Sequence, residues 1–175
     1  MLKKIALVLA VLIVVILVLA ATRPDRFHVE RTATVNAPPE AIFPLINDFH
    51  EWGKWSPYEK LDPGMRRTYD GAASGTGAVY QWDGNSQAGK GRMEIARSNP
   101  NSLVSIKLDF DKPLESHNVA QFTLQPRGTS TEVTWSMDGP NLFVGKVMGL
   151  FIDMDNMIGR DFETGLANLG AAARH

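Results

Sequence analysis

Few residues in this sequence have the types and spacing that catalysis requires. The four histidines, His28, His50, His117 and His175, have no carboxylate or serine at a spacing typical of an acid–base or nucleophilic pair. No metal-binding pattern such as H-E-x-x-H occurs, and the absence of cysteine excludes thiolate ligands, cysteine nucleophiles and disulfides. We therefore predict no catalytic residue, no metal site and no cofactor.

A second set of ionisable residues lies near the C-terminus, where Asp153, Asp155, Asp161 and Glu163 fall in one amphipathic segment. They lie partly off its apolar stripe, which predicts a solvated face. If one of them points inward, it becomes the best acid–base candidate, because burial raises the pKa of a carboxyl group.

The aromatic residues of DFHEWGKWSPYEK suggest binding or packing rather than catalysis. Trp52 and Trp55 lie three residues apart, on one face of a short helical turn that ends at Pro57. Tryptophans in this setting bury a short helix against a sheet, or they line a pocket as well. Both interpretations remain open from the sequence.

The elements that position these residues follow from hydrophobic periodicity. Residues 27–35 alternate apolar and polar side chains, with Arg31 as the odd member, and residues 65–137 keep a period of two almost throughout. This spacing with tight turns predicts one mostly meandering antiparallel sheet with a polar and an apolar face. Between these strand regions, Pro38 and Pro39 suit the first turn of a short helix, which Pro44 is expected to kink or shorten.

The last segment changes to a helical period. Its apolar side chains recur every three to four residues, at Phe143, Val147, Leu150, Met154, Met157, Ile158, Phe162, Leu166 and Leu169. We predict one long amphipathic helix of about eight turns. It contains Gly145, Gly149, Gly159 and Gly165, each costing about 1 kcal/mol relative to alanine, so it must pack on something large. The apolar face of the sheet is the candidate.

The N-terminus differs from the rest of the chain. After Lys3 and Lys4, an uncharged apolar run extends over Ile5–Ala21, about 25 Å as a helix, against about 30 Å for a bilayer core. This favours an uncleaved anchor (residues 1–22) before a single domain (residues 23–175). A cleaved signal peptide is the alternative. The charges flanking the run are nearly balanced, and the amino terminus favours a single-pass protein whose domain lies on the extracytoplasmic, periplasmic side.

The charge of the soluble part excludes one class of partner. Once Lys3 and Lys4 are set aside, 16 basic residues face 19 acidic ones, a net charge of −3. No basic stripe of a nucleic-acid binder is present, so we expect no nucleic-acid partner.

The order of these elements resembles a known superfamily. A strand, two short helices, six antiparallel strands and a long C-terminal helix is the helix-grip order of the START-like (SRPBCC) superfamily, an α+β fold. The local matches are INDFHEWGKWSP, GAVYQWDGNSQAGKGRMEI, TEVTWSMDGP and IGRDFETGLANL, and they resemble most closely its polyketide cyclase/dehydrase-like branch. The resemblance covers nearly all of residues 27–172, and its motifs specify fold better than function.

The resemblance implies a cavity between the concave sheet face and the C-terminal helix. Its implied lining is Trp55, Tyr80, Trp82, Met93, Ile95, Phe110, Phe122 and Trp135, with Val147, Phe151 and Met154 from the helix. The resulting hypothesis is a membrane-tethered, non-catalytic protein that binds a hydrophobic or lipid-like small molecule. The alternatives are a cyclase- or hydrolase-type enzyme, and an accessory or stress-related interaction protein without a ligand. An exposed apolar patch near Trp52 or Phe143 without an open cavity would favour the last.

Overall fold

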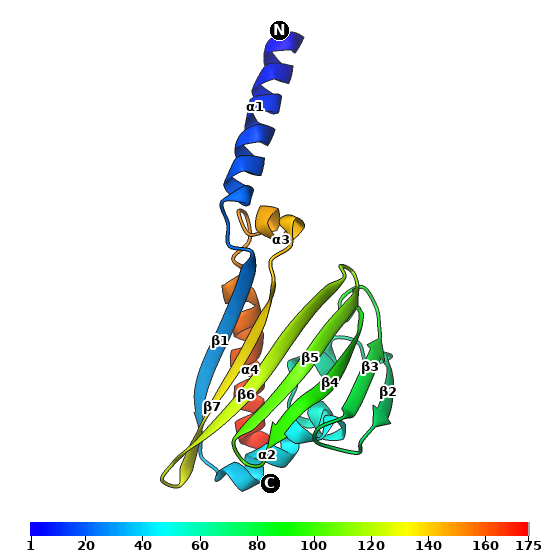
Figure 1. Cartoon of the computed structure of the whole chain (residues 1–175), viewed down its shortest axis with the longest axis vertical. Coiled ribbons are helices and arrows are strands. Elements are labelled where there is room, and N and C mark those ends of the chain that lie inside the picture. Colours follow the sequence, from blue (N-terminus) through cyan, green and yellow to red (C-terminus); the bar gives the residue numbers. More distant parts are fainter. Residues whose placement is uncertain (175) are drawn as a thin grey trace.

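The computed structural model describes residues 1–174, and of Leu2 only the backbone; His175 lies outside the described residues. The elements, in chain order (Figure 1), are α1 (Leu2–Ala21), β1 (Arg26–Val35), α2 (Pro39–Asn47), the 3-10 helices η1 (Phe49–Lys54) and η2 (Pro57–Lys60), β2 (Arg66–Gly71), β3 (Ala78–Asp83), β4 (Lys90–Asn99), β5 (Leu103–Lys112), β6 (Ser116–Arg127), β7 (Ser130–Pro140), α3 (Phe143–Met148) and α4 (Met154–Ala172).

All seven strands form one antiparallel sheet in the order β1-β7-β6-β5-β4-β3-β2. Strands β2 to β7 follow one another as a meander, and β1 pairs with β7 at the edge, with Phe27 opposite Gly139. Along each strand, alternate residues point to the same face, and on β6 Asn118, Ala120, Phe122 and Leu124 are all buried. The predicted antiparallel sheet with one apolar face is confirmed.

The inner face of the sheet is covered by helices. Helix α4 packs chiefly against β1, and α2 contacts both β6 and α4 (Figure 1). The buried residues of α4 include Phe162, Leu166 and Leu169, spaced at helical intervals. The long helix gripped by a curved sheet is the arrangement predicted from the sequence.

The short helices differ in detail from the expectation. Helix α2 begins at Pro39 as predicted and continues through Pro44 to Asn47, so this proline does not break it. Pro57 does not simply end η1, because it opens a third short helix, η2.

The prediction of one continuous helix over residues 143–169 is wrong. Helix α3 ends at Met148, and α4 begins only at Met154. The Asp153 side chain is the N-cap of α4, with its Oδ1 accepting a hydrogen bond from the Asn156 backbone N–H at 3.0 Å. Gly149, at the end of α3, weakens the helix further. Apolar side chains continue across the break, which is why periodicity alone did not detect it.

Helix α1 projects from one end of the domain and packs against α3 (Figure 1). Its stretch Lys3–Ala21 is, among the described residues, the one helix long and apolar enough to cross a membrane. The same end of the domain carries α3 and the β5–β6 turn, whereas the β6–β7 hairpin lies at the opposite end.

Candidate functional site

The two tryptophans of the short helices hold the insert together. Trp55 is completely buried, and its Nε1 donates to the Leu45 carbonyl oxygen at 2.8 Å. Trp52 Nε1 donates to the Ile46 carbonyl oxygen at 3.0 Å. Both carbonyls belong to the last turn of α2, where backbone acceptors lack partners within the helix. The pair therefore caps α2 as well as filling the core.

An aromatic stack fills the interior beneath the middle of α4. The Trp135 ring lies between Phe162, with centroids 4.1 Å apart and planes at 7°, and Phe122 at 4.8 Å. Trp55 meets it edge-on at 5.5 Å. Gly165 permits this approach, because a Cβ there would lie 2.6 Å from Trp135 Cζ3. This part of the interior is packed with side chains.

The eleven residues of the implied lining occupy three environments. Seven are buried, namely Trp55, Tyr80, Trp82, Met93, Ile95, Phe122 and Trp135. Phe110, Val147 and Met154 are half-buried, and Phe151, in the connection between α3 and α4, is 71% exposed. The structure thus brings seven of these residues into one core and leaves the other four at its edge.

The inner face is less well covered toward the end that carries α1. On β5, Val104 and Ile106 are 0% exposed, whereas Leu108 and Phe110, on the same face, are only half-buried. Both pack against the edge of the core. Helix α4 packs chiefly against β1, at the other edge of the sheet from β2 and three strands from β5. The inward-facing side is therefore sealed at one end and partly open at the other.

Polar atoms without partners lie within this apolar interior. Among the described residues, Trp135 Nε1, Asn118 Oδ1 and Ser56 Oγ are buried and make no hydrogen bond. Asn118 is 6% exposed and uses its Nδ2 to donate to Ser116 Oγ at 3.1 Å. Buried polar groups are normally paired, so these three atoms are exceptions within the packed interior.

Two ionisable side chains lie at the edge of the interior. Asp161 is half-buried on α4, and burial raises the pKa of its carboxyl group. Burial also raises the pKa of the Tyr58 phenol, and the nearby Asp161 carboxylate raises it further. The other acidic residues of this segment, Asp153, Asp155 and Glu163, are exposed as predicted. Asp161 is therefore the acid–base candidate of the set.

A polar cluster not predicted from the sequence joins η2 to β2 and β3. Glu59 Oε1 accepts from Tyr80 Oη at 2.5 Å, and its Oε2 accepts from Arg67 Nε at 2.7 Å. Burial and the Glu59 carboxylate raise the pKa of Tyr80. The Trp82 indole also finds a partner, the Ala88 carbonyl oxygen at 2.9 Å. Twenty-one residues separate Glu59 from Tyr80, so only the fold reveals this cluster.

The histidines correct one statement made from the sequence. His28 and His117 each bond an aspartate on the neighbouring strand, Asp138 and Asp109, at 2.8 Å. His50 bonds Asp48, two residues earlier, at 2.8 Å. The histidines therefore do have carboxylate partners, and sheet register creates two of the pairs. All three are surface pairs, and no group of three or more metal-ligating side chains occurs among residues 1–174.

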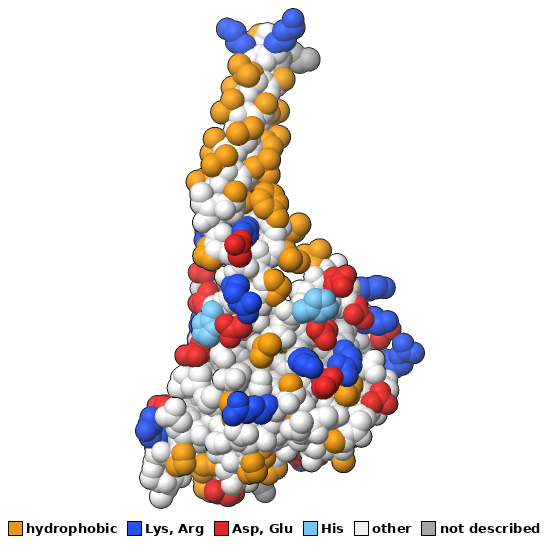
Figure 2. Space-filling model, in the orientation of Figure 1, with side chains coloured by type: hydrophobic (Ala, Val, Ile, Leu, Met, Phe, Trp, Pro, Cys, Tyr) orange, Lys and Arg blue, Asp and Glu red, His pale blue; other side chains and the backbone are white. Residues whose placement is uncertain are grey.

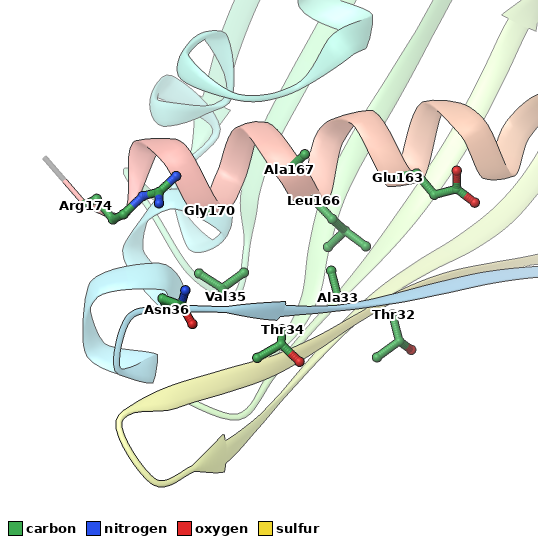
Figure 3. A pocket seen from close by; sticks show the side chains of 10 residues that line it. All are labelled: Thr32, Ala33, Thr34, Val35, Asn36, Glu163, Leu166, Ala167, Gly170 and Arg174. Atoms are coloured by element: carbon green, nitrogen blue, oxygen red, sulfur yellow. The ribbon is translucent and has the colours of Figure 1, made fainter.

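Two pockets lie outside this interior. One, of about 320 Å³, follows β1 and α4, where Leu166 and Val35 point into the space between strand and helix (Figure 3). The other, of about 770 Å³, lies between α2 and the end of α4 and includes Lys54 and Lys60. Neither contains any of the eleven predicted lining residues.

A seven-stranded antiparallel sheet gripping a C-terminal helix defines the START-like, helix-grip class of folds. The family model described as polyketide cyclase / dehydrase and lipid transport matches residues 26–174. The chain belongs to this family, and the resemblance seen in the sequence is confirmed.

Solved structures share the fold at low sequence identity. A crystal structure of a protein from Chromobacterium violaceum has 18% identity and a TM-score of 0.59, covering 87% of this chain and 99% of that one. One from Mesorhizobium loti has 15% identity and a TM-score of 0.62, covering 83% and 96%. The solution structure of the Aha1 dimer from Colwellia psychrerythraea has 15% identity and a TM-score of 0.59, covering 84% and 96%. No curated protein matches the chain.

Proposed function

We propose that the protein binds a hydrophobic or lipid-like small molecule without catalysis, against the partly open end of the inner sheet face. The observation that carries this proposal is that Leu108 and Phe110 point inward yet are only half-buried. Of the residues implied by the family, Met93 pairs with Leu108, and Trp82 packs edge-on against Phe110 at 5.6 Å. These four would contact the ligand, and the fully buried residues would form the floor beneath it.

The chemistry of this end suits an apolar molecule. Covering apolar side chains contributes roughly 25 cal/mol per Å² of area removed from water. The family description, which includes lipid transport, supports the same ligand class.

A membrane tether fits such a ligand. We propose that residues 1–22 remain uncleaved and anchor residues 23–175 on the extracytoplasmic side. The 20 residues of α1 span about 30 Å, the thickness of a bilayer core. Ala20, at the junction with the domain, is 0% exposed. This packing supports an α1 that is retained rather than cleaved as a signal peptide. Apolar ligands partition into the bilayer beside the domain.

Native mass spectrometry of the full chain, released from detergent, tests the binding proposal. We expect one apolar molecule per chain to be retained, and the Leu108→Trp variant to lose it because the larger ring fills the open end. Val119→Trp is the matched control, because Val119 lies on the outer face and is 43% exposed. Lipids bound only to α1 would remain in both variants.

Equal retention by both variants would contradict a ligand at the inner face. A folded wild-type chain that carries no molecule would contradict the binding function itself. Circular dichroism and tryptophan emission of each variant establish that it is folded before the comparison is made.

An enzymatic role is the second candidate, and one observation favours it. Asp161 is a half-buried carboxyl group whose pKa burial raises, as general acid–base catalysis requires. In the proposed non-catalytic protein, Asp161→Asn keeps the co-purifying molecule chemically unchanged. A chemically different molecule on Asp161→Asn than on wild type would favour catalysis.

A further inference from the structure

The segment that follows β7 carries an apolar surface, here named the α3 surface. It consists of the exposed side chains of Leu142, Phe143, Val144, Met148, Phe151 and Ile152, which are 39% to 71% exposed. Hydrophobic side chains gather around α3 at the base of α1 (Figure 2). Six large apolar side chains exposed within eleven residues mark an interaction site rather than scattered surface hydrophobics.

The α3 surface has no exposed charge. The one charged residue between Leu142 and Ile152 is Lys146, which is 9% exposed and turned toward the domain. Its Nζ donates to Asp25 Oδ1 at 2.5 Å, and this contact lowers the pKa of Asp25. The charge is thus neutralised at the linker after α1, away from the apolar side chains. Such a surface is compatible with a hydrocarbon environment.

The α3 surface lies beside the end of the apolar span of α1. Among the α1 side chains that the structure describes, all are exposed except Ile16 and Ala20, which lie one turn apart on one face. Helix α3 packs against α1. Ile16 lies five residues before the end of α1 at Ala21, so the covered face reaches about 7.5 Å into the apolar span.

We propose that the α3 surface is a second membrane contact, embedded in the interface of the leaflet where α1 ends. This inference rests on the proposed membrane tether. Amphipathic interfacial helices bury their apolar face about 5–10 Å into the boundary between headgroups and acyl chains. The depth set by Ile16 lies within that range, so a bilayer crossed by α1 must also reach α3.

The contact deepens the proposed function. Helix α3 turns away to meet α1, and the chain is not helical between Met148 and Met154. Leu108 and Phe110, near the β5–β6 turn at the same end of the domain, are only half-buried. The open end of the inner face lies at the end of the domain from which α1 projects (Figure 1), and with the proposed tether this end faces the bilayer. An apolar molecule would move between the leaflet and the inner face along α3.

Single-cysteine labelling of the full chain in liposomes tests this contact, because the natural sequence contains no cysteine. A fluorophore sensitive to polarity is placed at Phe151, at Leu12 in the middle of α1, or at Thr129 in the β6–β7 hairpin. Vesicles of phosphatidylcholine and phosphatidylglycerol carry nitroxide quenchers at a shallow or a deep acyl position. We expect quenching of Leu12 by the deep quencher, quenching of Phe151 by the shallow one, and none at Thr129.

The pattern across the three sites separates the two proposals. Quenching at Leu12 without quenching at Phe151 would overturn the α3 contact while the tether stands. A blue shift at Phe151 that rises with protein density, without quenching, would assign the α3 surface to a second copy and also overturn it. No quenching at Leu12 would refute the tether, and with it the inference. A further variant combines Phe151→Glu with the fluorophore at position 143. Because Phe151 is exposed, this variant should fold normally, and the added charge should abolish quenching of the label at position 143 by the shallow quencher.

Discussion

The two ends of the inner sheet face are built from the same strands but differ in what covers them. At the sealed end, Phe122, Trp135 and Phe162 stack under α4, and Trp55 closes the stack from the side. At the open end, Leu108 and Phe110 continue the same alternation without a helix over them. Strand period selects which side chains face inward, and the helices decide which of them are removed from water.

The two ends also hold α4 differently. Toward its C-terminus the helix is held by buried apolar side chains, Phe162, Leu166 and Leu169. Arg31 reaches from β1 and bonds Asp155, near the start of α4, at 2.9 Å and Glu163, in the middle of α4, at 3.0 Å. Gly159 makes room for the guanidinium, since a Cβ there would lie 2.0 Å from Arg31 Nη2. Arg31, the odd member of its strand in the sequence, is an inward-facing residue that bonds the helix.

The largest expected difference is in the loss of stability when one phenylalanine at each end of the inner face is replaced by alanine. Phe122→Ala should lower the free energy of unfolding by about 3–5 kcal/mol, because the cavity lies in a fully packed stack. Phe110→Ala should cost less than half of that, since its ring is only half-buried. Urea denaturation followed by tryptophan emission measures both. Equal losses would show that the open end is packed as tightly as the sealed one.

A smaller effect is expected from adding one methyl group to α4. Gly165→Ala places a Cβ against Trp135 and should cost about 1–3 kcal/mol through overpacking. Gly170→Ala is the matched control on the same helix, because its Cβ would meet Val35 at an ordinary 3.6 Å. That control should gain up to about 1 kcal/mol from helix propensity. Thermal unfolding of both variants gives the comparison, and a neutral Gly165→Ala would contradict the close contact.

Acid should weaken the start of α4 before its buried end. The bond from Arg31 lowers the pKa of Asp155 below its ordinary value of 3.8. A carboxyl group whose pKa is lowered by folding stabilises the folded state at pH values above its ordinary pKa. This stabilisation is lost as the pH falls through the folded-state pKa. The stability difference between wild type and Asp155→Asn should therefore shrink below pH 3.8. In an Arg31→Met background this pH dependence should vanish, and its persistence would assign it to another group.

The smallest effect concerns the surface near the open end. The hydrogen bond that the His117 ring donates to Asp109 is the main reason why the pKa of His117 is raised above 6.5. A histidine whose pKa is raised by folding stabilises the folded state at pH values below its ordinary pKa. This stabilisation is lost as the pH rises through the folded-state pKa. An NMR titration of the His117 ring should give a midpoint above 6.5, and Asp109→Asn should lower it. An unchanged midpoint in that variant would rule out the pair as the cause.

Much of the fold could be predicted because it depends on local pattern. The period of two predicted the sheet and its inward residues, and Pro39 marked the start of α2. The resemblance to the START-like superfamily was carried by motifs now covered by the family match over residues 26–174. The site could be predicted only as a set of inward side chains.

What the sequence could not predict depends on contacts between distant residues. Neither the Glu59–Tyr80 bond nor the His117–Asp109 pair follows from spacing, because the fold brings these partners together. The break between α3 and α4 was hidden because apolar residues recur on both sides of it.

The sequence by itself determined the strands, the inward faces and the apolar N-terminal helix, since these follow from side-chain alternation and composition within short windows. Only the tertiary structure decided that α3 packs on α1 rather than extending α4, and that Leu108 and Phe110 are only half-buried. The physical reason is that burial depends on which surfaces meet, and that is set by the whole chain.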